Sequence, residues 1–129
     1  MIEDGAPVTA RLYMTEVDGR QMLVSDLSGI SSTLDLQQAV RLGSEMVQSQ
    51  PPKSVRILVD MTGVKYSLDF FAVVQQSVAV NRPFVKARAV VGLPEEALAA
   101  FAVVAKLSDS PMARFDSVEE AKAWLASIE

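Results

Sequence analysis

The residues best suited to chemistry follow one apolar run in the middle of the chain. Val55–Val59 is continuously hydrophobic, and Asp60 comes directly after it. The carboxyl ends of strands are where open α/β sheets usually bind ligands. The candidate loop and ligand residues are therefore the polar ones that follow this run: Asp60, Thr62, Lys65, Tyr66 and Asp69.

Asp60 has two interpretations. An aspartate in this position serves as the phosphoacceptor of receiver domains, but those domains also need an acidic pair after their first strand and a lysine after their last, and neither is present. Aspartate also commonly accepts hydrogen bonds from backbone amides two residues on. We therefore favour a structural role for Asp60 in the turn Asp60–Gly63.

Ser67 begins a predicted helix and is a candidate regulatory phosphosite. Free amides and the helix dipole would attract a phosphate there, although Asp69 would repel it. The alternative, which we favour, is that Ser67 caps the helix and Asp69 is an acid in its first turn.

Composition excludes several classes of site. The chain has no cysteine and no histidine, so zinc sites built on these residues, disulfides and nucleophile–histidine pairs are absent. Asp60 and Asp69 without a partner base make a poor catalytic set. We expect no enzymatic activity, no catalytic residue, no metal and no cofactor.

The formal net charge of −4 argues against nucleic acid as a partner, because binding to phosphates needs a basic surface. Arg82, Lys86 and Arg88 form the nearest basic cluster, and the last two share one face of a predicted strand. We expect a solvated face here, with an anion or partner contact as the alternative.

An N-terminal β-hairpin is predicted from two apolar segments, Val8–Thr15 and Gln21–Leu27, around the turn residues Asp18 and Gly19. The resulting register gives each face one apolar pair: Met14 with Leu23, and Tyr13 with Val24. The pairing predicts that both faces of the hairpin are covered.

Strands and helices alternate through the rest of the chain. Hydrophobic spacing and capping residues predict strands at Val55–Val59, Val85–Val91 and Met112–Phe115, and helices at about 33–48, Leu68–Val80, Glu95–Leu107 and about 118–128. The order β-β-α-β-α-β-α-β-α predicts one α/β domain over residues 1–129. It has a mostly parallel sheet with Val55–Val59 as central strand, an N-terminal hairpin and about four helices.

The third predicted helix is apolar on all sides. Its run Ala97–Ala105 is far shorter than the roughly 20 residues needed to span a bilayer, so another surface must cover it. Its cover is the domain core, a second copy of the chain, or an apolar ligand whose pocket it walls. We favour the core or a homodimer, with Leu98, Phe101 and Val104 as interface candidates.

Three stretches together resemble the SpoIIAA-like branch of the STAS superfamily, also described as STAS/SEC14-like: Arg56–Val64, Ala87–Gly92 and Arg114–Leu125. The resemblance implies the SpoIIAA-like fold and a non-enzymatic switch or interaction module. Antagonist members carry a phosphorylatable serine in an Asp-Ser-Ser or Asp-Ser-Thr setting. Here the corresponding stretch, Val64–Phe70, lacks that pair, and only Ser67 lies nearby.

We therefore expect a regulatory module that binds an unidentified protein partner. The alternative is a carrier or sensor of a lipid or other small apolar ligand, which the SEC14-like description implies. The stretch Met1–Pro7 is acidic and has no apolar signal segment, so we expect a cytoplasmic location.

Overall fold

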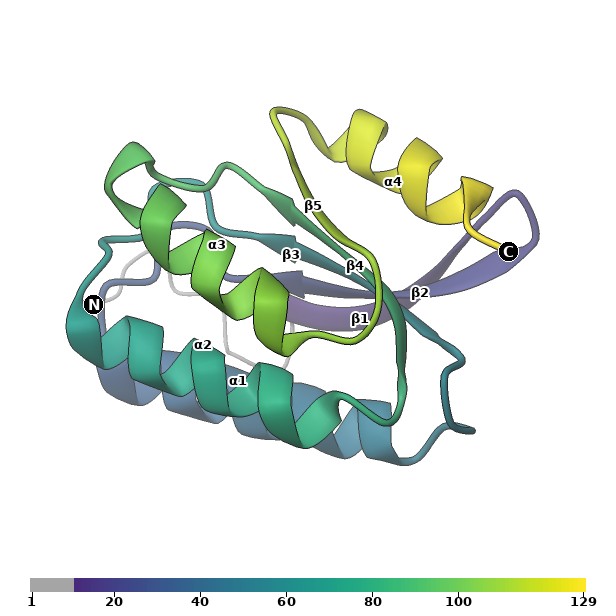
Figure 1. Ribbon diagram of the computed structural model, residues 1–129, viewed down its shortest axis with the longest axis horizontal. Coiled ribbons are helices and arrows are strands. Elements are labelled where there is room, and N and C mark those ends of the chain that lie inside the picture. Colours follow the sequence, from purple (N-terminus) through teal and green to yellow (C-terminus); the bar gives the residue numbers. More distant parts are fainter. Residues whose placement is uncertain (1–10) are drawn as a thin grey trace.

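A five-stranded sheet organises residues 11–129, the part of the chain that this computed structural model describes (Figure 1). The strands lie in chain order across the sheet: β1 (Leu12–Val17), β2 (Arg20–Asp26), β3 (Val55–Asp60), β4 (Val85–Val91) and β5 (Met112–Phe115). Only β1 and β2 are antiparallel. The predicted mostly parallel sheet, with β3 at its centre, is confirmed.

The β1–β2 hairpin turns at Asp18 and Gly19, which have φ angles of 52° and 79°. The predicted register is confirmed by two cross-strand pairs, Tyr13 with Val24 and Met14 with Leu23. The prediction that both faces are covered is wrong for β1. This strand is the sheet edge, so Tyr13 and Met14 stay 48% and 39% exposed, while their partners on β2 are buried. The predicted strand residues 8–10 lie outside the described residues.

Serine side chains cap several of the helices. The helices are α1 (Thr33–Gln48), α2 (Leu68–Asn81), α3 (Leu98–Leu107) and α4 (Val118–Ser127), and a short 3₁₀ turn, η2 (Glu95–Ala97), precedes α3. Ser32, Ser67 and Ser117 each accept a hydrogen bond from a first-turn amide. Within residues 11–129, no helix has the length and apolar character to cross a membrane.

The sheet separates two apolar layers. On one face α4 buries Leu125 against Met22 and Leu58. On the other face α1 and α2 lie side by side, with α3 next to α2 (Figure 1). The predicted α/β class and the element order are confirmed.

Candidate ligand-binding site

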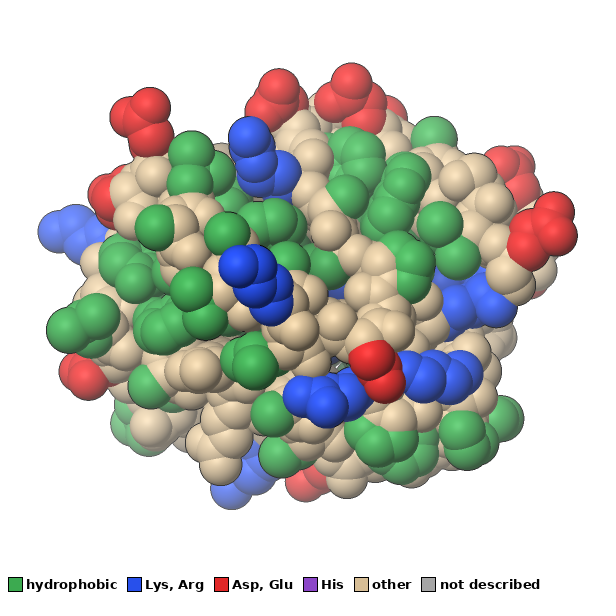
Figure 2. Space-filling model, viewed as in Figure 1, with side chains coloured by type: hydrophobic (Ala, Val, Ile, Leu, Met, Phe, Trp, Pro, Cys, Tyr) green, Lys and Arg blue, Asp and Glu red, His purple; other side chains and the backbone are tan. Residues whose placement is uncertain are grey.

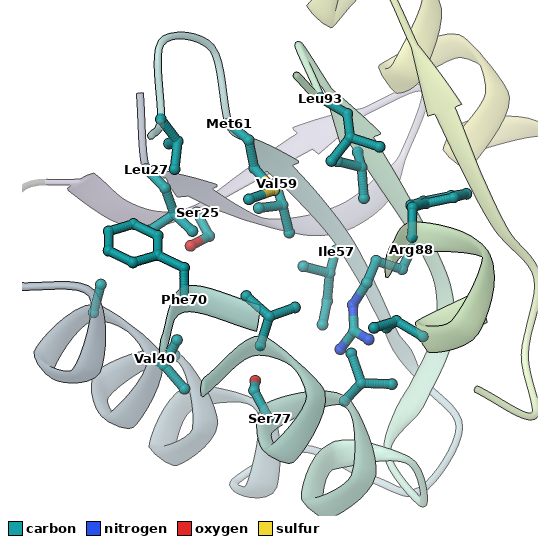
Figure 3. Close-up of a pocket in the computed structure, with 18 of the residues that line it drawn as sticks. Ser25, Leu27, Val40, Ile57, Val59, Met61, Phe70, Ser77, Arg88 and Leu93 are labelled. Atoms are coloured by element: carbon teal, nitrogen blue, oxygen red, sulfur yellow. The ribbon is translucent and has the colours of Figure 1, made fainter. Parts of the chain in front are cut away.

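An apolar cavity of about 120 Å³ lies between the sheet and the three helices α1, α2 and α3. Side chains from β2, β3 and β4 project into it from the sheet, and Figure 3 shows several of them facing α1 and α2. The sheet side of the wall includes Ser25, Leu27, Ile57, Val59, Arg88 and Val90. Almost all of this surface is hydrocarbon.

Small residues on the helices leave this space open. Ala39 and Gly43 line the cavity from α1, Ala97 lines it from η2, and Ala100 lines it from α3. A Cβ at Gly43 would also lie 3.1 Å from the Leu12 side chain, so a glycine here lets α1 approach β1 closely. Short side chains keep the helices near the sheet without filling the region between them.

The expected interface residues on α3 are divided by this arrangement. Phe101 and Val104 line the cavity, and Val104 is only 2% exposed, so it is not a surface residue. Leu98 and Val103 are 36% and 49% exposed. The inner side of α3 thus belongs to the core, as one of the favoured alternatives predicts, and it also borders the cavity, whereas the second copy stays a prediction.

Arg88 brings a charge into this apolar space. It lies on β4 between Ile57 of β3 and Met112 of β5 and is only 5% exposed. Its side chain points into the cavity (Figure 3). Within residues 11–129, no group accepts a hydrogen bond from its guanidinium. Burial lowers the pKa of Arg88 to about 10, so the group is still protonated at neutral pH.

The expectation of a solvated basic face is therefore wrong for Arg88. Helices α2 and α3 cover this part of the sheet, so a side chain on this face of β4 projects inward. Lys86, two residues earlier on the same face, is half-buried, and Arg82 at the end of α2 is exposed. The three basic residues do not form one patch.

Arg56 shows how the same chain satisfies a buried guanidinium. It lies on the opposite face of the sheet, where its Nε donates to the carbonyl oxygen of Leu125 at 3.1 Å and its Nη2 to that of Ile128 at 2.7 Å. Burial, with a smaller contribution from nearby Arg20, lowers the pKa of Arg56. These bonds satisfy the carbonyl end of α4. Arg88 has no such arrangement.

The other polar groups at the cavity are neutral. Asn81 is 3% exposed, and its amide nitrogen donates to the hydroxyls of Ser44 at 3.1 Å and Ser77 at 3.3 Å. Its amide oxygen accepts from Gln48 at 3.1 Å. This network joins α1 to α2. No acidic side chain of the described residues lines the cavity.

Asp60 has the structural role that the sequence favours. Its Oδ1 accepts hydrogen bonds from the amide of Thr62 at 3.0 Å and from the Thr62 hydroxyl at 2.7 Å. The end of β2 repeats this turn, since Oδ1 of Asp26 accepts from the amide of Ser28 at 3.0 Å and from its hydroxyl at 2.5 Å. Both aspartates shape loops.

The two turns are joined through the backbone. The amide of Leu27 donates to the carbonyl oxygen of Asp60, and the amide of Gly29 donates to that of Thr62, both at 2.8 Å. Gly92, at the end of β4, has a φ of 71° and lies so close to Thr62 that a Cβ there would be 2.9 Å from the threonine Cα. The carboxyl ends of β2, β3 and β4 thus pack closely against one another.

The remaining predicted site residues do not converge on one centre. The Ser67 hydroxyl accepts from the amide of Phe70 at 3.1 Å, which confirms it as the N-cap of α2. Asp69 is in the first turn, and its side chain and that of Lys65 are exposed. Only Tyr66 of this group reaches the cavity. The sequence indicated a pocket beside the third helix only as an alternative, and it gave no expectation that Arg88 lines such a pocket. The signal available was an arginine within the otherwise apolar end of β4.

Neither a protein-family model nor a curated protein matches the sequence. The structure is similar to the crystal structure of an uncharacterized protein from the DUF3478 family with a SpoIIAA-like fold, from Shewanella loihica PV-4. The TM-score is 0.71 at 17% sequence identity, and the match covers 88% of this chain and 91% of that one. The chain thus has the SpoIIAA-like fold that its sequence resembles.

Proposed function

We propose that this STAS-like module is a non-enzymatic carrier or sensor that holds a small apolar ligand in the cavity beneath α1, α2 and α3. The observation that supports the proposal is the volume of about 120 Å³ with an almost wholly hydrocarbon wall. Protein interiors normally contain few voids larger than a water molecule. An apolar cavity of about 150 Å³ binds benzene.

Catalysis finds little support at this site. Asp60 uses its Oδ1 for the Thr62 turn, and Asp69 projects from the exposed first turn of α2. Neither lines the cavity. A general acid or base must come within hydrogen-bonding reach of the reacting group. Binding without chemistry is the simpler use of such a site.

The regulatory role through a protein partner, the homodimer and the cytoplasmic location stay predictions. Figure 2 shows hydrophobic side chains over α3 and around α4 on one face of the molecule, with acidic side chains mostly at its edges. Exposed apolar groups of this kind suit a partner without identifying one. The cavity has a more definite shape, and it therefore carries the proposed function.

Benzene binding tests the proposal directly. We expect benzene to cause saturable NMR shifts in residues that line the cavity, and native mass spectrometry of freshly purified protein to reveal a small co-purified molecule. Val104→Phe should fill the cavity and abolish the shifts, because Val104 projects into it. Val103→Phe, one residue away on the exposed side of the same helix, is the matched control and should retain them. A lack of saturable shifts in the unmodified protein would overturn the proposal.

A further inference from the structure

We propose that Arg88 makes this cavity a site for a small apolar carboxylic acid, with the carboxylate on the guanidinium and the hydrocarbon part among the apolar side chains. The inference rests on the proposed function and specifies the ligand class. It follows from the charge of the cavity, the arrangement of its polar groups and its size.

The first step is the unbalanced charge. Arg88 is 5% exposed, and its five N–H donors have no acceptor among residues 11–129. Buried charges in proteins are normally paired and hydrogen-bonded. Where this chain buries an arginine for structure alone, at Arg56, two carbonyl groups accept its hydrogen bonds. A guanidinium that faces a cavity instead of a helix end is arranged to bind an anion.

The second step is the number of charges. Arg88 is the only charged residue among those that line the cavity in the described part of the chain. One negative charge therefore neutralises the site, whereas a phosphate monoester carries up to two near neutral pH. A planar carboxylate also matches the fork of a guanidinium with two parallel hydrogen bonds. Charge balance and geometry both favour a carboxylate.

A second donor lies on α2. The Ser77 hydroxyl projects into the same cavity as Arg88 (Figure 3). It accepts a hydrogen bond from Asn81 at 3.3 Å, which leaves its own proton to donate. A carboxylate on Arg88 thus has a neutral donor on the helix facing the strand. This donor helps to orient the acid.

The third step is size. A cavity of about 120 Å³ is slightly smaller than the one of about 150 Å³ that accepts benzene. Its apolar wall at Ile57, Val59 and Phe101 suits a short aliphatic chain or a single ring. The ligand class is therefore a short aliphatic or aryl carboxylic acid rather than a long-chain lipid.

The test compares six-carbon probes whose head groups differ in charge or in geometry. Calorimetric titration or NMR would measure the affinity of hexanoate, hexanamide, hexylamine, hexyl sulfonate and hexyl phosphate for the intact protein. We expect hexanoate to bind at least tenfold more tightly than hexanamide, and hexylamine not to bind. Hexyl phosphate or sulfonate binding more tightly than hexanoate would overturn the choice of a carboxylate.

Variants assign the preference to Arg88. Arg88→Met should remove the tenfold preference for hexanoate over hexanamide. Lys86→Met removes a positive charge from the same strand outside the cavity, so it should retain the preference. Circular dichroism and Trp124 fluorescence verify that both variants fold. The inference is overturned if Arg88→Met still prefers hexanoate, or if the unmodified protein binds hexanoate and hexanamide equally. In either case, benzene binding by the unmodified protein would still support the proposed function. Failure of benzene as well would overturn both.

Discussion

Replacing Arg88 with methionine should make the ligand-free protein more stable. Burial lowers the pKa of Arg88 from its ordinary value to about 10. At about 1.4 kcal/mol for each tenfold change in the protonation equilibrium, burying the charged form costs about 3 kcal/mol. Methionine is unbranched and apolar and fills part of the same space. We expect Arg88→Met to raise the free energy of unfolding by about 1–3 kcal/mol, in line with other replacements of buried charges.

The pH dependence has a defined sign. A basic group whose pKa is lower in the folded protein than in the unfolded chain destabilises the folded state. The full destabilisation is present below the pKa of the folded state, and it disappears as pH rises toward the pKa of the unfolded state. The advantage of Arg88→Met should thus be complete at neutral pH and should shrink above about pH 10. Measurements between pH 6 and 10, a range chosen on the same linkage argument, should show roughly constant stabilisation.

Urea denaturation followed by Trp124 fluorescence is a suitable assay. Trp124 is the only tryptophan and packs against Phe115, with ring centroids 5.4 Å apart, so its emission reports the packing of α4 on the sheet. The protein must first be unfolded and refolded to release bound molecules, because a ligand would stabilise the unmodified protein. The melting temperature of Arg88→Met should rise by about 5–10 °C.

Arg56→Met is the matched control. It removes the hydrogen bonds to Leu125 and Ile128, so we expect it to lower the free energy of unfolding by about 2–3 kcal/mol. The two substitutions are chemically identical and should have opposite signs. Destabilisation of similar size by both would show that Arg88 is satisfied in the free protein, which refutes the reasoning from its burial.

Three further predictions concern the turns at the strand ends and the surface of α3. Gly92→Ala should lower the free energy of unfolding by about 2–5 kcal/mol in urea denaturation, because the positive φ of Gly92 and the nearby Thr62 backbone both oppose a Cβ. Gly19 also has a positive φ, but a Cβ there would meet open space, so Gly19→Ala should cost only about 1–2 kcal/mol. Asp60→Asn should change the free energy of unfolding by less than about 0.5 kcal/mol, because the asparagine side-chain oxygen still accepts both hydrogen bonds from Thr62. Asp60→Ala loses both bonds and should cost about 1 kcal/mol. A large effect of the asparagine variant would contradict a purely structural role for Asp60. Sedimentation should detect a homodimer that Leu98→Glu dissociates without unfolding, and a single species near 13.9 kDa in the unmodified protein would reject the dimer.

Sequence reasoning located the elements well because their signals are local. The serine caps and the alternation of apolar residues fixed α1 and β4 to the residue, and the DG turn fixed the hairpin register. The predicted start of the third helix, Glu95, is three residues too early. Glu95–Ala97 forms a 3₁₀ turn with Pro94 as its N-cap, and α3 begins only at Leu98. Local propensity distinguishes these two helix types poorly.

The size and the lining of the cavity could not be predicted from the sequence, because they depend on how distant residues align. Gly43 and Ala100 belong to different helices, and their small size creates space only because both face the same part of the sheet. Arg88 was assigned to a solvated face because the period of a strand identifies which residues share a face and does not identify what covers it. Its burial follows from the positions of α2 and α3.

The hydrogen bonding around the cavity is unequal, and this determines which of its walls can move most easily. The hydrogen bonds between the Asp26 and Asp60 turns fix the carboxyl ends of β2 and β3, and the Asn81 network holds α1 to α2. Within residues 11–129, no side-chain hydrogen bond joins α3 to either of those helices, so apolar contact alone holds it in place. We therefore expect α3 to be the wall that moves outward most readily. Amide hydrogen exchange in α3 should be faster than in α1, and it should slow when the cavity is filled. The same weak attachment would allow small adjustments of the cavity to short ligands of slightly different shape, so α3 would set the tolerance of the site for the hydrocarbon part of the ligand.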